Sequence, residues 1–235
     1  MHNSLSRSVL LAVAASLLLF LVMPGGAAPA AKHFALDSNT GLKLQNVTVE
    51  PATLQGKKGV KMQASDLNGA QGSFLAVIGG LTFGDGTIEA EIAGEPGTGA
   101  GQGARGFVGI AFRVSDDLKT YDNFYLRPTN GRADDQERRN HAAQYESLPD
   151  WPWSRLRKET PSKYESYVDL ITGMWTTIKI DVRGDHARLY VHNQEQPVLI
   201  INDVKSGAKA KGGVALWIDN GTVAHFRNLT VTSVD

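Results

Sequence analysis

The amino-acid sequence predicts an all-β protein, a β-sandwich of two antiparallel sheets with a long loop insert at residues 127–165. Apolar and polar residues alternate with a period of two along many short segments, and pairs of turn-forming residues separate these segments. No stretch after residue 31 has the periodicity of an amphipathic helix. Because each expected strand has one apolar and one polar side, each sheet should bury one face and expose the other.

The expected strands follow one another with short turns between them. In the first clear one, at 86–93, the apolar side chains Ile88, Ala90 and Ile92 alternate with acids. The same alternation recurs at 106–114, 121–128, 177–182, 187–192 and 214–219, and Phe226, Leu229 and Val231 close the chain. Turn residues stand at 84–86, 183–185 and 220–221. We expect one sandwich domain at residues 31–235.

Composition and charge exclude several classes of protein. In 235 residues, 24 Lys and Arg balance 24 Asp and Glu, so the chain lacks the basic excess of a nucleic-acid-binding protein. Without Cys it has no disulfide framework, thiol nucleophile or thiolate zinc site. The six His residues show no zinc-binding spacing, and no Gly-x-Ser-x-Gly nucleophile motif is present.

Residues 1–30 are expected to be a secretory signal peptide. A largely apolar run at 9–23 is followed by Pro-Gly-Gly at 24–26 and by the small-residue pattern Ala-Pro-Ala at 28–30. The alternative is an uncleaved membrane anchor, for which the run is short, because a spanning helix needs about 20 apolar residues. We therefore expect cleavage after Ala30, export to the periplasm or the extracellular space, and no stable membrane anchor afterwards.

The insert at 127–165 interrupts the strand pattern and is rich in cations and aromatic rings. Loops of this length without secondary structure are uncommon in compact domains and tend to be functional. Sugars offer C–H faces that stack on aromatic rings and hydroxyl groups that bond to Arg, Asn, Gln and carboxylates. The insert is therefore a candidate site. Alternatively it is a structural cover, in which Trp151 and Trp153 form a small core of their own.

Three parts of the chain resemble the concanavalin A-like lectin/glucanase superfamily. They are FGDGTIEAE at 83–91, WTTIKIDVRGDHARLYV at 175–191, and GGVALW at 212–217 together with AHFRNLTV at 224–231. They are most similar to bacterial laminin-G-like and 3-keto-disaccharide hydrolase-type domains. The resemblance implies a jelly-roll sandwich whose concave sheet commonly holds carbohydrate. It also implies a structural calcium ion in some members, for which 116–117 or 219–220 could supply oxygens. No motif marks that ion or any other cofactor or metal.

The resemblance to family 16 glucanases is incomplete. Those enzymes carry a Glu-x-Asp-x-x-Glu strand, whereas residues 89–95 lack the middle Asp, and Gly94 interrupts the strand. Glu89 and Glu91 still share one strand face about 6.5–7 Å apart, a separation that a glycosidase carboxyl pair allows. An acidic face exposed to solvent is the alternative. The candidate catalytic residues are Glu89, Glu91, His141, Glu146 and Glu165.

The polar side of the expected strand at 121–128 leads directly into the insert. Small residues on the neighbouring strand, Gly109 and Ala111, would leave room for a ligand against the sheet. We expect the insert to fold over the concave side and to complete a binding surface there. The candidate ligand-binding residues are Arg113, Asn123, Tyr125, Arg127, Asn130, Arg132, Arg138, Arg139, Gln144, Tyr145, Trp151 and Trp153.

These observations favour a secreted carbohydrate-binding domain, with an oligosaccharide or glycoside as its ligand. The alternative is a glycoside-acting enzyme of the 3-keto-glycoside hydrolase or lyase type, in which an acid and a base act at one carbon. A second alternative is a protein-interaction sandwich, because Arg, Trp and Tyr dominate the energetically important positions of protein interfaces.

Overall fold

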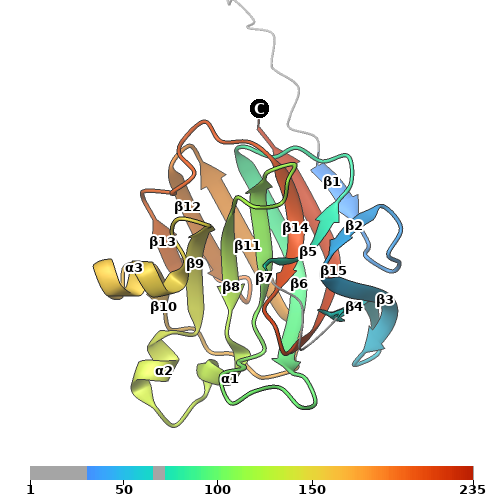
Figure 1. Ribbon diagram of the computed structural model, residues 1–235, viewed down its shortest axis with the longest axis horizontal. Helices are drawn as coiled ribbons and strands as arrows, with labels where there is room; N and C mark the ends of the chain where they lie inside the picture. The colour runs from blue at the N-terminus through green and yellow to red at the C-terminus, as the bar shows by residue number, and fades with distance from the viewer. Residues whose placement is uncertain (1–30, 66–71, 235) are drawn as a thin grey trace, which may run out of the picture.

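The computed structural model of the protein describes residues 31–65 and 72–234. In this part the chain forms two antiparallel sheets that pack face to face (Figure 1). Sheet A contains, in spatial order, β13 (Leu199–Ile201), β12 (His186–Val191), β11 (Thr176–Arg183), β6 (Gly86–Pro96), β15 (Thr222–Ser233), β4 (Lys57–Ala64) and β3 (Val47–Leu54), with β1 (Ala31–Phe34) paired to β15. Sheet B contains β10 (Glu165–Ser166), β9 (Ala143–Leu148), β8 (Tyr121–Leu126), β7 (Val108–Val114), β14 (Gly213–Ile218), β5 (Phe74–Ile78) and β2 (Leu42–Gln45). The predicted signal peptide lies outside the described residues.

The predicted alternation decides which side chains fill the space between the sheets. Apolar residues on β6, β7, β11, β12, β14 and β15 all lie in one buried core and are spaced two positions apart, except across the register shift between Arg227 and Thr230 of β15: Ile88, Ala90, Ile92, Val108, Ile110, Phe112, Ile178, Ile180, Val182, Ala187, Leu189, Val191, Val214, Leu216, Ile218, Phe226, Leu229 and Val231. A period of two places such residues on one face of a strand. The prediction of an all-β sandwich is therefore confirmed.

Sheet B differs from the prediction because its outer face is buried as well. Every residue of β7 and β8 is buried. The outward side chains Tyr121, Tyr125 and Trp217 belong to a second apolar cluster, to which Leu118, from the turn between β7 and β8, also contributes. Phe107 packs against this cluster. The expectation of one buried and one exposed face is therefore wrong for the centre of sheet B.

The outer face also has less space than the small residues predicted. A Cβ atom added to Gly109 would lie only 2.6 Å from Cβ of Tyr125 on the neighbouring strand. Real Cβ atoms do not approach other atoms so closely, so glycine at this position lets β7 and β8 lie side by side. Tyr125, rather than open space for a ligand, occupies the region above Gly109.

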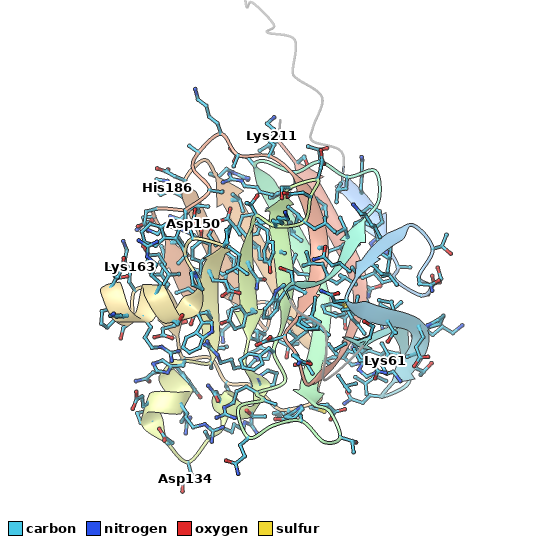
Figure 2. The ribbon with its side chains drawn as sticks, in the orientation of Figure 1. Lys61, Asp134, Asp150, Lys163, His186 and Lys211 are labelled. Carbon is cyan, nitrogen blue, oxygen red and sulfur yellow. The ribbon has the colours of Figure 1, made fainter. Side chains whose placement is uncertain are left out.

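The segment 127–165 is not a loop throughout. It contains α1 (Pro128–Gly131), α2 (Gln136–Asn140), β9, α3 (Trp153–Glu159) and the first residue of β10. Strand β9 pairs with β8 over its whole length and so extends sheet B. In Figure 2, Asp150 lies near the end of β9 and Asp134 at the opposite end of the molecule, so the segment runs along this edge of the sheet. The segment therefore widens sheet B instead of only folding over it.

Arg113 connects β7 to three loops. It has a φ of +53° and lies opposite the register shift at Gly213 and Val214, a β-bulge that turns its side chain out of the regular alternation. Its guanidinium group donates to the carbonyl oxygens of Gly84, Gly184 and Gly207, to Ser206 Oγ and to Asp85 Oδ1, at 2.8 to 3.1 Å. All five N–H donors are used. Arg113, predicted as a ligand-binding residue, has no donor left for a ligand.

We expect Arg113→Met to lower the free energy of unfolding by about 3 kcal/mol, because it removes the shared donor of the buried Gly84 carbonyl, of the partly buried Gly184 and Gly207 carbonyls and of the Asp85 carboxylate. Urea unfolding followed by circular dichroism measures this loss. The matched control is Arg188→Met, since Arg188 lies on β12 of sheet A and should change stability by less than about 0.5 kcal/mol. Equal effects of the two substitutions would contradict the role given to Arg113.

Candidate functional site

Several predicted residues meet on the outer face of sheet B. Asn123 and Tyr125 come from β8, Gln144 and Glu146 from β9, and Arg127 directly follows β8. In the register of the two strands, Asn123 lies opposite Glu146 and Tyr125 opposite Gln144, so their side chains share one face. All are at least 96 % buried. We call these five residues the sheet B polar cluster.

Arg127 is the centre of this cluster. Its Nη1 donates to the carbonyl oxygen of His141 at 2.9 Å, and its Nη2 donates to Tyr125 Oη at 2.9 Å and to Gln144 Oε1 at 3.2 Å. All three acceptors are uncharged. The guanidinium carbon also lies 4.9 Å from the ring centroid of Tyr125 and 5.8 Å from that of Trp153. Cation–π attraction and neutral hydrogen bonds therefore stabilise this buried charge.

Glu146 lies beside Arg127 in an environment with little water. Its Oε1 accepts from Asn123 Nδ2 at 3.3 Å, and its Oε2 accepts from the backbone N–H of Trp153 at 3.2 Å. Burial raises the pKa of Glu146 to about 7, and repulsion from Asp219 adds to this rise, while these hydrogen bonds and the charge of Arg127 act against it. Asn123 Oδ1 is buried without a partner among the described residues. Glu146 can therefore hold or release a proton near neutral pH.

Aromatic rings surround the sheet B polar cluster. The Trp217 ring lies 4.7 Å from that of Tyr125, and the Phe107 ring lies 6.1 Å from it on an edge-to-face geometry. Trp153, the first residue of α3, keeps 42 % of its surface exposed. The guanidinium carbon of Arg157 lies 4.7 Å from the Trp153 ring centroid. Among the rings around the sheet B polar cluster, that of Trp153 is the most exposed.

Sequence reasoning missed Phe107, Trp217 and Asp219 as members of this site. A signal was present, because Trp217 and Asp219 alternate with the core residues Leu216 and Ile218 and so point outward. A large aromatic residue on the outward side of a strand is unusual unless something covers or binds it. The proximity of β14 to β8 across β7, however, is visible only in the structure.

His141 and Glu165, predicted as catalytic residues, form an ion-paired group at the edge of the cluster. Arg157 Nε donates to both carboxylate oxygens of Glu165, and Arg157 Nη2 donates to Glu165 Oε2 at 2.6 Å. His141 Nε2 lies 3.3 Å from Glu165 Oε1. Burial lowers the pKa of His141, with Glu165 acting in the opposite direction and Arg157 in the same direction. Arg157 already engages Glu165, so this group holds α3 against β10.

Tyr145 and Trp151 lie away from the sheet B polar cluster. Tyr145 points from β9 into the core, donates to Asp122 Oδ1 at 2.6 Å and accepts from the backbone N–H of Lys205 at 2.8 Å. The Trp151 ring is flanked by the Arg155 guanidinium at 3.8 Å and by Lys205 Nζ at 4.6 Å. Trp151 borders a cavity of 310 Å³ at the far end of β8 and β9, away from the sheet B polar cluster. Trp153, not Trp151, is therefore the tryptophan beside Arg127.

The other predicted arginines and Asn130 lie around α1 and α2. Arg132 is exposed and forms a bidentate ion pair with Asp169 at 2.7 and 2.8 Å. Arg139 donates to Tyr167 Oη at 2.9 Å. Asn130 and Arg138 contact each other and lie beside Arg127, since Asn130 Nδ2 and Arg127 Nη1 both donate to the His141 carbonyl.

The predicted carboxyl pair Glu89 and Glu91 lies on the outer face of the other sheet. Both belong to β6 of sheet A, so the sandwich core separates them from the sheet B polar cluster. Burial tends to raise the pKa of Glu91, but hydrogen bonds from Lys57 and Asn228 and the charge of Arg227 lower it overall. Glu91 is thus a paired carboxylate, with Lys57 Nζ at 3.0 Å. The two acids do not join the other candidates.

Within residues 31–65 and 72–234, no three His, Asp or Glu side chains are grouped so that they could hold a metal ion. None of the helices in the same ranges has the length and apolar character needed to cross a bilayer.

The raised pKa of Glu146 has a measurable effect on stability. Because its pKa is about 7 in the folded chain and near 4.5 in the unfolded chain, the folded state binds the proton more tightly, and stability is lost as pH rises from 4.5 through 7. The full effect is about 3 kcal/mol. Glu146→Gln should therefore gain stability relative to the native protein between pH 5 and pH 8. Urea unfolding at both pH values tests this, with exposed Glu195→Gln as the control; a difference that does not change with pH would contradict it.

Comparisons with known proteins identify the fold. No protein-family description matches the sequence, and no curated protein matches it. Among solved structures, the chain is similar to the carbohydrate-binding module CBM66 from Bacillus subtilis, with a TM-score of 0.51, 14% identity, and coverage of 80% of this chain and 97% of that one. It is also similar to a Bacillus subtilis protein of unknown function with a galectin-like fold (TM-score 0.50, 12% identity, 88% and 96% coverage). A third similar structure is the Crh5 transglycosylase in complex with NAG (TM-score 0.50, 13% identity, 89% and 86% coverage). The protein therefore has the concanavalin A-like, galectin-type sandwich fold that its strand pattern resembles.

Proposed function

We propose that the protein binds a saccharide on the outer face of sheet B, at the surface that Trp153 and Phe107 form above Arg127. The observation that carries this proposal is the convergence of a buried guanidinium group with the rings of Tyr125, Trp153 and Phe107 on one sheet face. Aromatic faces suit sugar C–H groups, and Arg, Asn and Gln side chains suit hydroxyl groups.

The position of each side chain supports this use. Trp153 is the exposed platform, and Arg157 beside it is partly exposed and can donate to sugar hydroxyl groups. Arg127 and Gln144 lie beneath and hold the rings in place. The fold adds support, since a carbohydrate-binding module and a transglycosylase solved with NAG share it. Export from the cell, as the N-terminal segment predicts, would bring the protein to extracellular or periplasmic polysaccharides.

Trp153→Ala should weaken saccharide binding by about ten-fold or more, since an exposed stacking platform typically contributes 1 to 2 kcal/mol, or about ten-fold in Kd. Screening the purified protein on a glycan array and titrating the best ligand by calorimetry measures this. The matched control is Tyr190→Ala, an aromatic residue on β12 of sheet A, which should leave Kd unchanged. Equal Kd values for Trp153→Ala and the native protein would contradict the placement of the site.

Glycoside cleavage is the second candidate function, and Glu146 favours it. A buried carboxyl group with a pKa of about 7 can donate a proton to a leaving oxygen at neutral pH. Asp219 is the other carboxyl group whose charge reaches this position, and burial raises its pKa as well. Glu146 would act as the general acid, with Asp219 as the second carboxyl group.

If this second function holds, the native protein releases product from an oligosaccharide or a 3-keto-glycoside, and its rate falls as pH rises above 7. Glu146→Gln should then reduce turnover by about 100-fold or more while binding is retained, because it removes the proton donor. Reducing-end analysis over a substrate panel measures the product. A native protein that binds saccharides but releases no product from the panel contradicts enzymatic function and leaves saccharide binding intact.

A further inference from the structure

Three arginines gather around α1 at one end of the sheet B surface. Arg127 and Asn130 both donate to the carbonyl oxygen of His141, at 2.9 and 3.3 Å, and Asn130 Oδ1 in turn accepts from Arg138 at 3.3 Å. Arg138 Nη2 also donates to the carbonyl of Thr129 at 3.4 Å, and the backbone N–H of Thr129 donates to the carbonyl of Arg105 at 3.3 Å. We call Arg105, Arg127 and Arg138 the arginine cluster.

The arginine cluster carries positive charge that no carboxylate neutralises by direct contact. In the part of the chain that the structure describes, every hydrogen-bond acceptor of these guanidinium groups is a carbonyl, an amide or a phenol oxygen. Three neighbouring cations differ, since they form ion pairs: Arg132 with Asp169, Arg155 with Glu159 and Arg157 with Glu165, while Arg139 donates to Tyr167 Oη. Arg127, the buried member of the cluster, therefore departs from the rule that buried charges in proteins are paired.

The cluster also has unused hydrogen-bonding capacity. Arg105 donates only from Nη1, to the carbonyls of Gln102 and Ala104, so Nε and Nη2 have no partner among the described residues. Arg138 Nη1 has none either, and the bonds from its other nitrogens are long, at 3.3 to 3.4 Å. The hydroxyl group of Thr129, between these two arginines, is buried and has no partner in the described part of the chain. Arg105 and Arg138 are both partly exposed and can be reached from solvent.

The electrostatics of the cluster agree with this geometry. Burial lowers the pKa of Arg105, and the positive charges of Arg138 and Arg127 lower it further. The three groups therefore repel one another in the free protein. A bound anion would relieve this repulsion and would form charge-assisted bonds to the free N–H groups.

We propose that the arginine cluster is an anion-binding subsite, which selects saccharides that carry a carboxylate or sulfate group. The proposal rests on the saccharide-binding function proposed above, and it names the class of ligand. Arg105 and Arg138 would contact the anion, and Arg127 would connect this subsite to the aromatic platform of Trp153 through its cation–π contact. A neutral sugar would leave the cluster unpaired.

Paired ligands that differ only in charge test this subsite. Oligogalacturonate is compared with its methyl ester, and a sulfated galactan oligosaccharide with its desulfated form, by calorimetry on the purified protein. The acidic member of at least one pair should bind about ten-fold or more tightly than its neutral partner, because charge-assisted hydrogen bonds are stronger than neutral ones. This preference should shrink as NaCl is raised.

Variants assign the preference to these residues. Arg105→Gln and Arg138→Gln should each reduce the acidic-over-neutral ratio, the double variant should remove it, and Arg105→Lys should keep part of it because the charge remains. Arg188→Gln on sheet A is the matched control and should keep the full ratio, since Arg188 likewise forms no ion pair among the described residues. Circular dichroism confirms that each variant is folded.

Each outcome decides between the two proposals. Equal binding of acidic and neutral members, or a preference that survives in the double variant, overturns the subsite and leaves saccharide binding at Trp153 in place. Binding of no saccharide in either pair overturns the subsite, and the absence of any bound saccharide on the glycan array as well overturns both proposals. An acidic preference that disappears only in the Arg105 and Arg138 variants supports the subsite.

Discussion

The buried guanidinium group of Arg127 is the constraint on which the candidate site depends. It is 4 % exposed and joins the end of β8 to β9, to the turn after α2 and to the start of α3, through bonds to Tyr125, Gln144 and the His141 carbonyl and through its contact with Trp153. A charge at this depth is tolerated only if dipoles and rings replace the water that it has lost. These partners are therefore held in one arrangement, and the platform of Trp153 is held with them.

The same burial explains why Glu146 is partly protonated near neutral pH, whereas the arginine cluster beside it keeps its positive charge. Glu146 lies in the same buried layer, and burial moves its pKa to about 7. The arginine cluster remains charged, because guanidinium groups keep their proton at any physiological pH. The free protein thus holds an acid that is partly neutral beside cations that are fully charged. This excess of positive charge is the reason for inferring an anionic ligand. Most other ionic groups nearby form direct ion pairs, such as Arg157 with Glu165.

The sandwich serves mainly to position these groups. A core of alternating apolar side chains fixes the two sheets, and Arg113 ties β7 to the loops at the end opposite α1. Function on such a fold depends on which side chains stand on the outer face, since one fold supports many activities. In this chain the distinctive outer face is that of sheet B, where strand β9 widens the sheet and α3 brings Trp153 over its surface.

The sequence by itself determined the elements whose information is local. Period-two alternation located β6, β7, β8, β11, β12 and β14. Alternation also placed Asn123, Tyr125 and Arg127 together on one face, because side chains two positions apart always share a face.

Only the tertiary structure decided the rest. The residues of β9 mix polar and apolar side chains without a clear period, so pairing with β8 makes them a strand, and this pairing brings Glu146 and Gln144 beside Asn123 and Tyr125. The assignment of Glu89 and Glu91 to the opposite sheet, and the choice of Trp153 over Trp151, depend on which distant strands become neighbours. Which strands pair with each other is set by contacts across the whole chain, and a local pattern of residues does not encode those contacts.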